Sequence, residues 1–111
     1  MTVDNLAKTL GLKVVCGEKG LQNEILGGYV SDLLSDVMGN AEQGQAWITL
    51  QVHKNIMAIA SLKELACIIV VKGLIPNTET IEQSNEEGIP ILSTESETFE
   101  IAGRLYELLQ G

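Results

Sequence analysis

The chain has few aromatic residues and little positive charge. Aromatic residues make up 4% of its 111 residues, so the core must be built from Leu, Ile, Val and Ala side chains rather than from stacked rings. Fifteen acidic residues stand against seven basic ones, and the formal net charge is −8. Such a charge opposes contact with nucleic-acid phosphates and with anionic membrane surfaces. We therefore expect neither nucleic acid nor a membrane as a partner.

Long apolar runs and paired cysteines are missing as well. The longest uninterrupted apolar stretches, such as residues 66–71, are far shorter than the ~20 residues that a membrane-spanning helix needs. Polar residues at Asp4, Asn5 and Lys8 break up the start of the chain, which does not fit a secretory signal peptide. Cys16 and Cys67 lack the spacing of a metal site or a redox pair. We expect buried reduced thiols and a cytoplasmic location.

The hydrophobic pattern alternates between helical and extended periods along the whole chain. A chain of this length fits one domain, residues 1–111. Helices are predicted at 3–10, ending at Gly11, from 33 to Gly44, at 56–62, at 78–87, ending at Gly88, and in the closing segment, whose apolar face runs from Phe99 to Leu109. Extended segments are predicted at 13–16, 24–30, 46–50, 66–71 and 89–92.

The segment 66–71, ACIIVV, has no polar alternation. That pattern is typical of a parallel strand that helices cover on both faces, so we place it at the centre of the sheet. From Ala46 onwards strands and helices alternate, which requires crossover connections. The sequence therefore predicts an α/β fold with a mainly parallel sheet flanked by helices. Trp47, inside a strand, is expected to pack in the core or at an interface.

Several polar residues precede helices and are predicted to cap them. Ser31 or Asp32 is expected to cap the second helix and Asn55 the third, since their side-chain oxygens can accept from free N–H groups. Thr94 and Glu97 have the spacing of a capping box before the last helix.

Ligands of open parallel sheets bind beyond the carboxyl ends of the strands, beside helix amino termini. Loops at 27–32, 50–55 and 71–77, and a fourth at 93–96, meet this description, and the loop with the only histidine is the densest in polar groups. The predicted ligand-binding residues are Gly27, Gly28, Ser31, Asp32, Thr49, Gln51, His53, Lys54, Asn55 and Gly73.

These residues keep alternative interpretations. Gly27 and Gly28 would let the backbone approach a phosphate or would form a β-bulge, and neither standard glycine-rich phosphate loop is present. Asp32 and Asp36 share a helix face, where they would hold a cation or complement the helix dipole. His53 is a candidate general base or an ordinary exposed or capping loop residue. No catalytic triad, metal motif or cofactor motif is recognised.

The segments 26–37, LGGYVSDLLSDV, and 47–56, WITLQVHKNI, followed by IPIL at 89–92, resemble the DRTGG domain family from about residue 26 to 111. The resemblance implies a fold like that of the amino-terminal domain of HPr kinase/phosphorylase. The resemblance also implies similarity to regulatory segments of some phosphate acetyltransferases and CBS-domain pyrophosphatases. In those proteins the domain accompanies a catalytic or sensing unit, and such domains tend to pair.

The name motif of the family is altered in this chain. Its Asp-Arg is replaced near Val52-His53-Lys54, and its Thr-Gly-Gly is replaced by Val71-Lys72-Gly73, with Gly73 retained. We expect a non-catalytic regulatory or sensor module that binds a small ligand, for instance a nucleotide or phosphometabolite, or a partner protein, and that forms a homodimer. A structural assembly protein and a small transferase or hydrolase that uses His53 are the alternatives.

Overall fold

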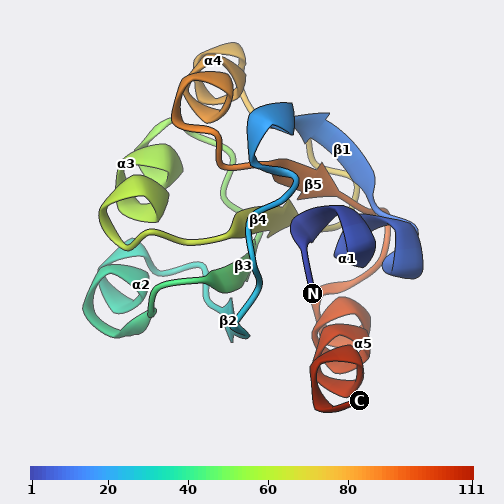
Figure 1. The fold of residues 1–111 in the computed structure, drawn as a ribbon. Helices are drawn as coiled ribbons and strands as arrows, with labels where there is room; N and C mark the ends of the chain where they lie inside the picture. Colours follow the sequence, from blue (N-terminus) through green and yellow to red (C-terminus); the bar gives the residue numbers. More distant parts are fainter.

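One five-stranded sheet organises the protein, whose computed structural model describes residues 1–111. In space the strands follow the order β1, β5, β4, β3, β2 (Figure 1). Strands β2 to β5 are parallel, and β1 pairs antiparallel with β5. The predicted mainly parallel sheet is confirmed. The strands are β1 (Lys13–Cys16), β2 (Gly27–Val30), β3 (Gln45–Thr49), β4 (Cys67–Val70) and β5 (Ile91–Ser93).

Strand β4 is the middle strand, and every one of its residues is buried. It pairs with β3 on one side and β5 on the other, both in parallel. Its uninterrupted apolar sequence is thus explained by helices on both faces of the sheet, and its predicted central position is confirmed.

Helices form a layer on each face of the sheet. α1 (Val3–Leu10) and α5 (Thr98–Gln110) lie on one face, and α2 (Leu34–Asn40), α3 (Asn55–Leu62) and α4 (Thr78–Glu87) on the other (Figure 1). Successive strand residues point to opposite layers: Ile48 belongs to the cluster beneath α1 and α5, and Trp47 to the cluster beneath α2 and α3. Trp47 is fully buried, as predicted. No helix has the length and apolar character needed to cross a bilayer.

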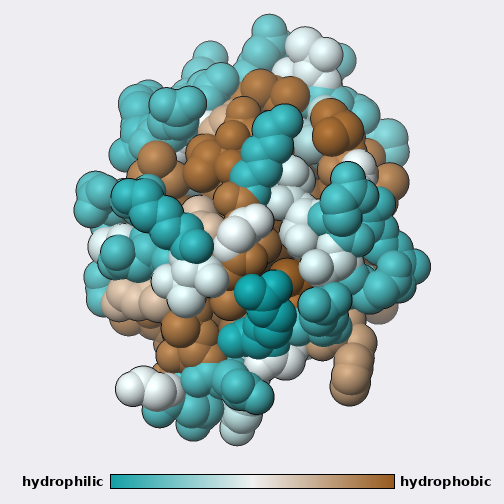
Figure 2. Space-filling view, turned by 90° about the vertical axis from the view of Figure 1, so that its right-hand side faces the viewer, coloured by the Kyte–Doolittle hydropathy of each residue, from teal (hydrophilic) through white to brown (hydrophobic).

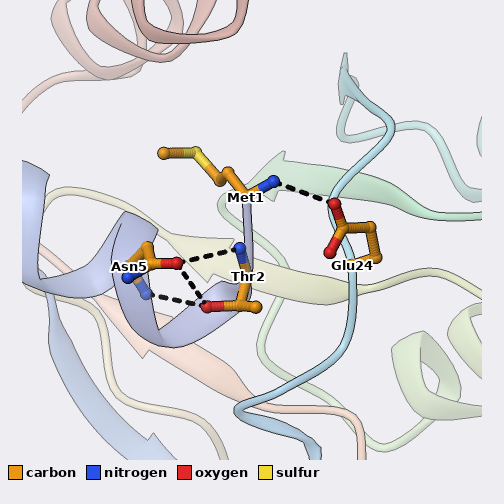
Figure 3. Close-up of polar contacts among 4 residues, drawn as sticks. All are labelled: Met1, Thr2, Asn5 and Glu24. Atoms are coloured by element: carbon orange, nitrogen blue, oxygen red, sulfur yellow. Dashed lines mark hydrogen bonds and ion pairs between the residues drawn. The ribbon is translucent and has the colours of Figure 1, made fainter.

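The first helix is fixed at both ends by its own sequence. Thr2 and Asn5 form a reciprocal capping box, and the Met1 amino group lies 2.9 Å from Glu24 Oε1 (Figure 3). Gly11 ends the helix in the left-handed conformation, at φ 68°, and Gly88 ends α4 in the same way, at φ 67°. Both predicted stops are confirmed, because a residue without a Cβ adopts this conformation at little cost.

The predicted caps of α2, α3 and α5 and the predicted stop of α2 are wrong. No side chain caps α2, α3 or α5. Asn55 is the first residue of α3 rather than its cap, and Thr94 Oγ1 accepts a hydrogen bond from Ser96 N instead of the first turn of α5. α2 ends at Asn40, so Gly44, at φ 80°, belongs to the turn before β3. Thr94 thus has another partner, α3 begins one residue earlier than predicted, and α2 ends earlier than predicted.

Gly27 and Gly28 do not form the bulge that was one of their two interpretations. Both pair with β3 in regular parallel register, and the irregularity of the sheet lies in β1, between Val14 and Cys16. A Cβ on Gly28 would lie 3.0 Å from Leu105 Cδ2. Gly28 therefore permits the close approach of α5 to the sheet.

Both cysteines are free and buried. Burial raises the pKa of Cys67 to about 12, and burial also raises the pKa of Cys16 above its ordinary value. At neutral pH both groups are therefore protonated thiols, which are poor nucleophiles.

Candidate functional site

The polar loops gather at one end of the sheet, where the parallel strands finish. β2, β3, β4 and β5 run in the same direction, so the loops that follow them all leave from their carboxyl ends. We call this end of the sheet the rim; it is formed by residues 31–33, 50–54, 71–77 and 94–97. Its existence was the central premise of the sequence-based site prediction.

Asp32 joins two of these loops. Its Oδ1 accepts a hydrogen bond from Thr49 Oγ1 at 2.8 Å and another from Leu50 N at 2.7 Å. In return, Gln51 Nε2 donates to the Asp32 carbonyl oxygen at 2.9 Å. The carboxylate predicted to cap α2 thus ties the loop after β2 to the loop after β3, and hydrogen bonds to an ionised acceptor are the stronger kind.

A buried indole fixes the same loop from below. Trp47 Nε1 donates to the Ser31 carbonyl oxygen at 2.8 Å, while Ser31 Oγ accepts from Leu33 N at 3.2 Å. Ser31, Asp32, Thr49 and Gln51 therefore bond to one another or to the backbone. These hydrogen bonds hold the rim together and use Asp32 Oδ1, the Thr49 and Ser31 hydroxyls and Gln51 Nε2.

We predict that Asp32→Ala lowers the free energy of unfolding by about 1.5–3 kcal/mol, the usual cost of losing hydrogen bonds to a charged group. The substitution leaves the hydroxyl of Thr49, a buried residue, without its acceptor. Asp32→Asn retains an acceptor oxygen and should lose less. Urea unfolding followed by circular dichroism measures both variants, and equal midpoints for wild type and Asp32→Ala would contradict the bridging role.

A pocket of about 460 Å³ opens beside this network, between the starts of α3 and α4. No hydrophobic residue lines it. From α3 and the loop before it come His53, Lys54 and Asn55; from α4 and its preceding residue come Asn77, Thr78 and Glu79. Three of the predicted site residues, His53, Lys54 and Asn55, thus share one concave surface.

Two polar contacts cross this pocket. The Asn77 side-chain amide lies 2.9 Å from His53 Nδ1, within hydrogen-bond distance. Lys54 Nζ lies 3.2 Å from Glu79 Oε2, and both side chains are about two-thirds exposed. An exposed ion pair of this kind contributes little to stability, so Lys54 can exchange Glu79 for another anion at small cost.

The first turn of α4 faces the same pocket. Asn77 occupies the N-cap position, but its side chain makes no capping bond because it contacts His53 instead. The first N–H groups of any helix have no partner within the helix and carry a partial positive charge. Acceptor atoms entering the pocket would therefore meet backbone donors as well as Lys54.

The remaining predicted residues lie elsewhere. Gly27 and Gly28 occur at the start of β2, opposite Gln45 and Ala46, and thus towards the other end of the sheet from the rim. Gly73 is on the rim, at φ 69°, and donates from its N–H to the Thr94 carbonyl oxygen at 2.8 Å. It faces the loop after β5 rather than the His53 pocket.

Asp32 and Asp36 do not act as a pair. Asp36 Oδ2 accepts a hydrogen bond from the Tyr29 hydroxyl at 2.8 Å, and Asn40 Nδ2 donates to Oδ1 at 3.0 Å. The bond from Tyr29 is the main cause that lowers the pKa of Asp36, and the same bond raises the pKa of Tyr29. The two carboxylates have separate partners, so the interpretation as a joint cation site is wrong.

Sequence reasoning missed Asn77, Thr78 and Glu79 as site residues. The signal was present, since residues 71–77 were recognised as a rim loop and α4 was predicted from residue 78. Their importance comes from the contact between α3 and α4, which places two helix starts together. The order of neighbouring strands, and hence of their loops, is needed to see this contact.

Comparison with known proteins identifies a family and a similar solved structure. The family model for the DRTGG domain matches residues 5–108, which includes the first strand and most of the first helix. The CBS and DRTGG domains of the regulatory region of Clostridium perfringens pyrophosphatase, in complex with the activator diadenosine tetraphosphate, have a similar structure, with a TM-score of 0.70 and 21% sequence identity. That alignment covers 98% of this chain and 46% of the other. This chain thus spans about half of that regulatory region, and the two share a fold.

Proposed function

Since this chain belongs to the DRTGG domain family, we propose that it is a non-catalytic regulatory module that binds a small phosphate-bearing ligand in the pocket between α3 and α4. The observation that carries the proposal is the pocket itself: a concave surface without apolar lining, at the amino ends of two helices. Helix amino termini of this kind are a common site for phosphate groups.

The chemistry of the pocket favours an acceptor-rich ligand. Lys54 offers an ammonium group whose ion pair with Glu79 is exposed, and the start of α4 offers uncapped N–H groups. The similar pyrophosphatase regulatory region is in complex with diadenosine tetraphosphate, a ligand that carries several phosphates. A nucleotide or a phosphometabolite is therefore the ligand class that we propose for this chain.

The same geometry gives no support to catalysis. A general base needs a nucleophile or a substrate proton within hydrogen-bond reach, and commonly a carboxylate behind it. His53 Nδ1 contacts the amide of Asn77, which is neither. We therefore propose binding without turnover. Of the two lysines near the altered family motif, we propose that Lys54 binds the ligand and that Lys72, whose partner is Glu97, does not.

The proposal is tested by titrating the ¹⁵N-labelled protein with a panel of nucleotides, including diadenosine tetraphosphate, and of phosphorylated metabolites. We expect one class to shift the amide signals of residues 53–55 and 77–80. Lys54→Ala should weaken binding about tenfold, the usual effect of removing one charge-assisted contact.

Lys63→Ala is the matched control, because Lys63 is at the carboxyl end of the same helix. It removes the same charge and should leave the affinity within about twofold of wild type. Titrations in which no member of the panel shifts these amides would refute the ligand-binding role. Equal weakening by both lysine variants would show that net charge, not the pocket, attracts the ligand.

We also propose that the module acts as a homodimer in the cytoplasm. The apolar side chains exposed on α5 support pairing, since contiguous apolar surface on a small domain is typical of an interface. A purely structural assembly role remains the alternative function, and it would keep the pairing but lack the ligand.

A further inference from the structure

Helix α5 has more apolar surface than the sheet covers. Ile101 and Leu105 are buried against the sheet. A second set of residues, Phe99, Ala102, Tyr106 and Leu109, follows at intervals of three, four and three positions. With 3.6 residues per turn these four form a separate stripe beside the buried one. We call it the α5 stripe.

The stripe is partly open to solvent: Phe99 and Tyr106 are exposed, whereas Ala102 and Leu109 are half-buried against the core. The side chains of Phe99 and Tyr106 are 91% and 67% exposed, and they are two of the few aromatic groups in the chain. On the face shown in Figure 2, brown apolar surface emerges between hydrophilic side chains in the lower part of the view, where α5 lies.

A shallow groove continues the stripe towards the edge of the sheet. It has a volume of about 210 Å³ and is lined almost entirely by apolar residues. Ala102, Tyr106 and Leu109 of the stripe form one wall together with Leu105; Gly28, Val30 and Ile48 lie on the sheet side. β2 is the last strand of the sheet, so no further strand covers Val30, which is 48% exposed.

The spacing of the stripe is symmetric about Arg104. Intervals of three, four and three residues read the same in both directions, and they match the a and d positions of a heptad. When two such helices pack antiparallel about a two-fold axis, Phe99 of one meets Leu109 of the other, and Tyr106 meets Ala102. The large ring of Tyr106 thus faces the smallest side chain of the stripe, which is the large-on-small packing that facing helices need.

The charged residues of α5 do not oppose this contact. Glu100, Arg104 and Glu107 are on the side of the helix away from the stripe by helical period. The charged groups of α5 are therefore kept outside the apolar seam, where solvent and salt screen them.

From the self-complementary spacing and the adjoining groove we infer that the α5 stripe is the interface with a second copy of this chain, packed antiparallel about a two-fold axis. A two-fold contact uses the same patch on both subunits, and a palindromic stripe supplies both halves of it. The inference rests on the homodimer proposed above and gives it a surface.

Sedimentation velocity over a range of concentrations tests the interface. We expect a dimer for the full chain, and for Tyr106→Glu a dissociation constant higher by about tenfold or more, as for a central aromatic contact. Leu62→Glu is the matched control, since Leu62 is 66% exposed on α3, in the other helical layer. It should leave the dissociation constant within about twofold of wild type.

Cysteine cross-linking tests the register. A mixture of an Ala102→Cys chain with a Tyr106→Cys chain should form a disulfide-linked dimer under mild oxidation, whereas each chain alone should not. The native thiols are buried and do not compete. Cross-linking of either single variant alone, to the same extent as the mixture, would overturn the antiparallel register.

The outcomes separate this inference from the proposals on which it rests. A dimer that Tyr106→Glu leaves intact would overturn the α5 interface while pairing itself stands. A chain that is monomeric at every concentration would overturn both, and would leave the stripe to a different protein. Neither result bears on the nucleotide titration, because the α3–α4 pocket lies in the opposite layer.

Discussion

Trp47→Ala should lower the free energy of unfolding by about 3–5 kcal/mol, the usual cost of truncating a large buried aromatic side chain. Trp47 is fully buried among residues from α2, α3 and the neighbouring strands, and it is the only tryptophan of the chain. The truncation leaves a cavity and also removes the hydrogen bond from Nε1 to the Ser31 carbonyl oxygen. A loss of this size is a large share of the stability of a typical domain.

Urea unfolding followed by far-ultraviolet circular dichroism measures the effect, since the fluorescent group itself is removed. Trp47→Phe is the comparison variant: it keeps a ring in the cavity and loses only the indole N–H and part of the volume. We expect it to cost less than half as much. A Trp47→Ala protein within about 1 kcal/mol of wild type would contradict the tight packing of this layer.

Gly17→Ala is expected to have the second largest effect. Gly17 adopts φ 75° before the short 3₁₀ helix at Glu18–Gly20, and a non-glycine residue in that region costs about 1–2 kcal/mol. An added Cβ would also lie 2.6 Å from Pro90 Cα and 2.7 Å from the Ile89 carbonyl oxygen. These are backbone atoms next to β5, which cannot move without disturbing the sheet, so overpacking adds about 1–3 kcal/mol.

Gly11→Ala isolates the steric part of this effect. Gly11 has nearly the same backbone angle, φ 68°, but nothing lies within 4 Å of an added Cβ. Both variants bear the cost of the left-handed conformation, and only Gly17→Ala meets other atoms. Unfolding midpoints in urea should therefore fall further for Gly17→Ala than for Gly11→Ala. Equal midpoints would mean that the β5 backbone yields easily.

The sheet was predictable from hydropathy because burial between two helical layers affects every residue of its central strand. A strand between two helical layers must be apolar at every position, and residues 66–71 are. Helix ends at Gly11 and Gly88 were equally clear, since the left-handed stop depends on the glycine itself. These features follow from the local sequence and one burial requirement.

The caps failed because their chemistry is not local. A carboxylate or amide before a helix can accept from that helix, but it can also reach another loop. Asp32 bonds to the loop after β3 and Asn77 to His53, and both partners are neighbours only because β2, β3 and β4 lie side by side. The sequence does not state which loops are adjacent.

The predicted site residues lie in separate places because the sequence does not state which loops are adjacent. His53, Lys54 and Asn55 share a pocket, whereas Asp32, Thr49 and Gln51 bond to one another. Gly27 and Gly28 seemed close to the rim because the extended segment was predicted to continue from 24 to 30. In the structure β2 begins only at Gly27, so both glycines are at its start, one strand length from the rim.

The antiparallel strand β1 has a consequence for synthesis on the ribosome. It is the first strand of the chain, yet its only neighbour in the sheet is β5, the last one, with Lys13 opposite Ser93. While β2, β3 and β4 emerge and pair in turn, β1 has no strand to pair with, although the helix before it already contacts residues 21–25 and packs on β3 and β4. β1 is therefore the last strand to join the nascent sheet, and until it does, the outer edge of β5 is accessible to chaperones.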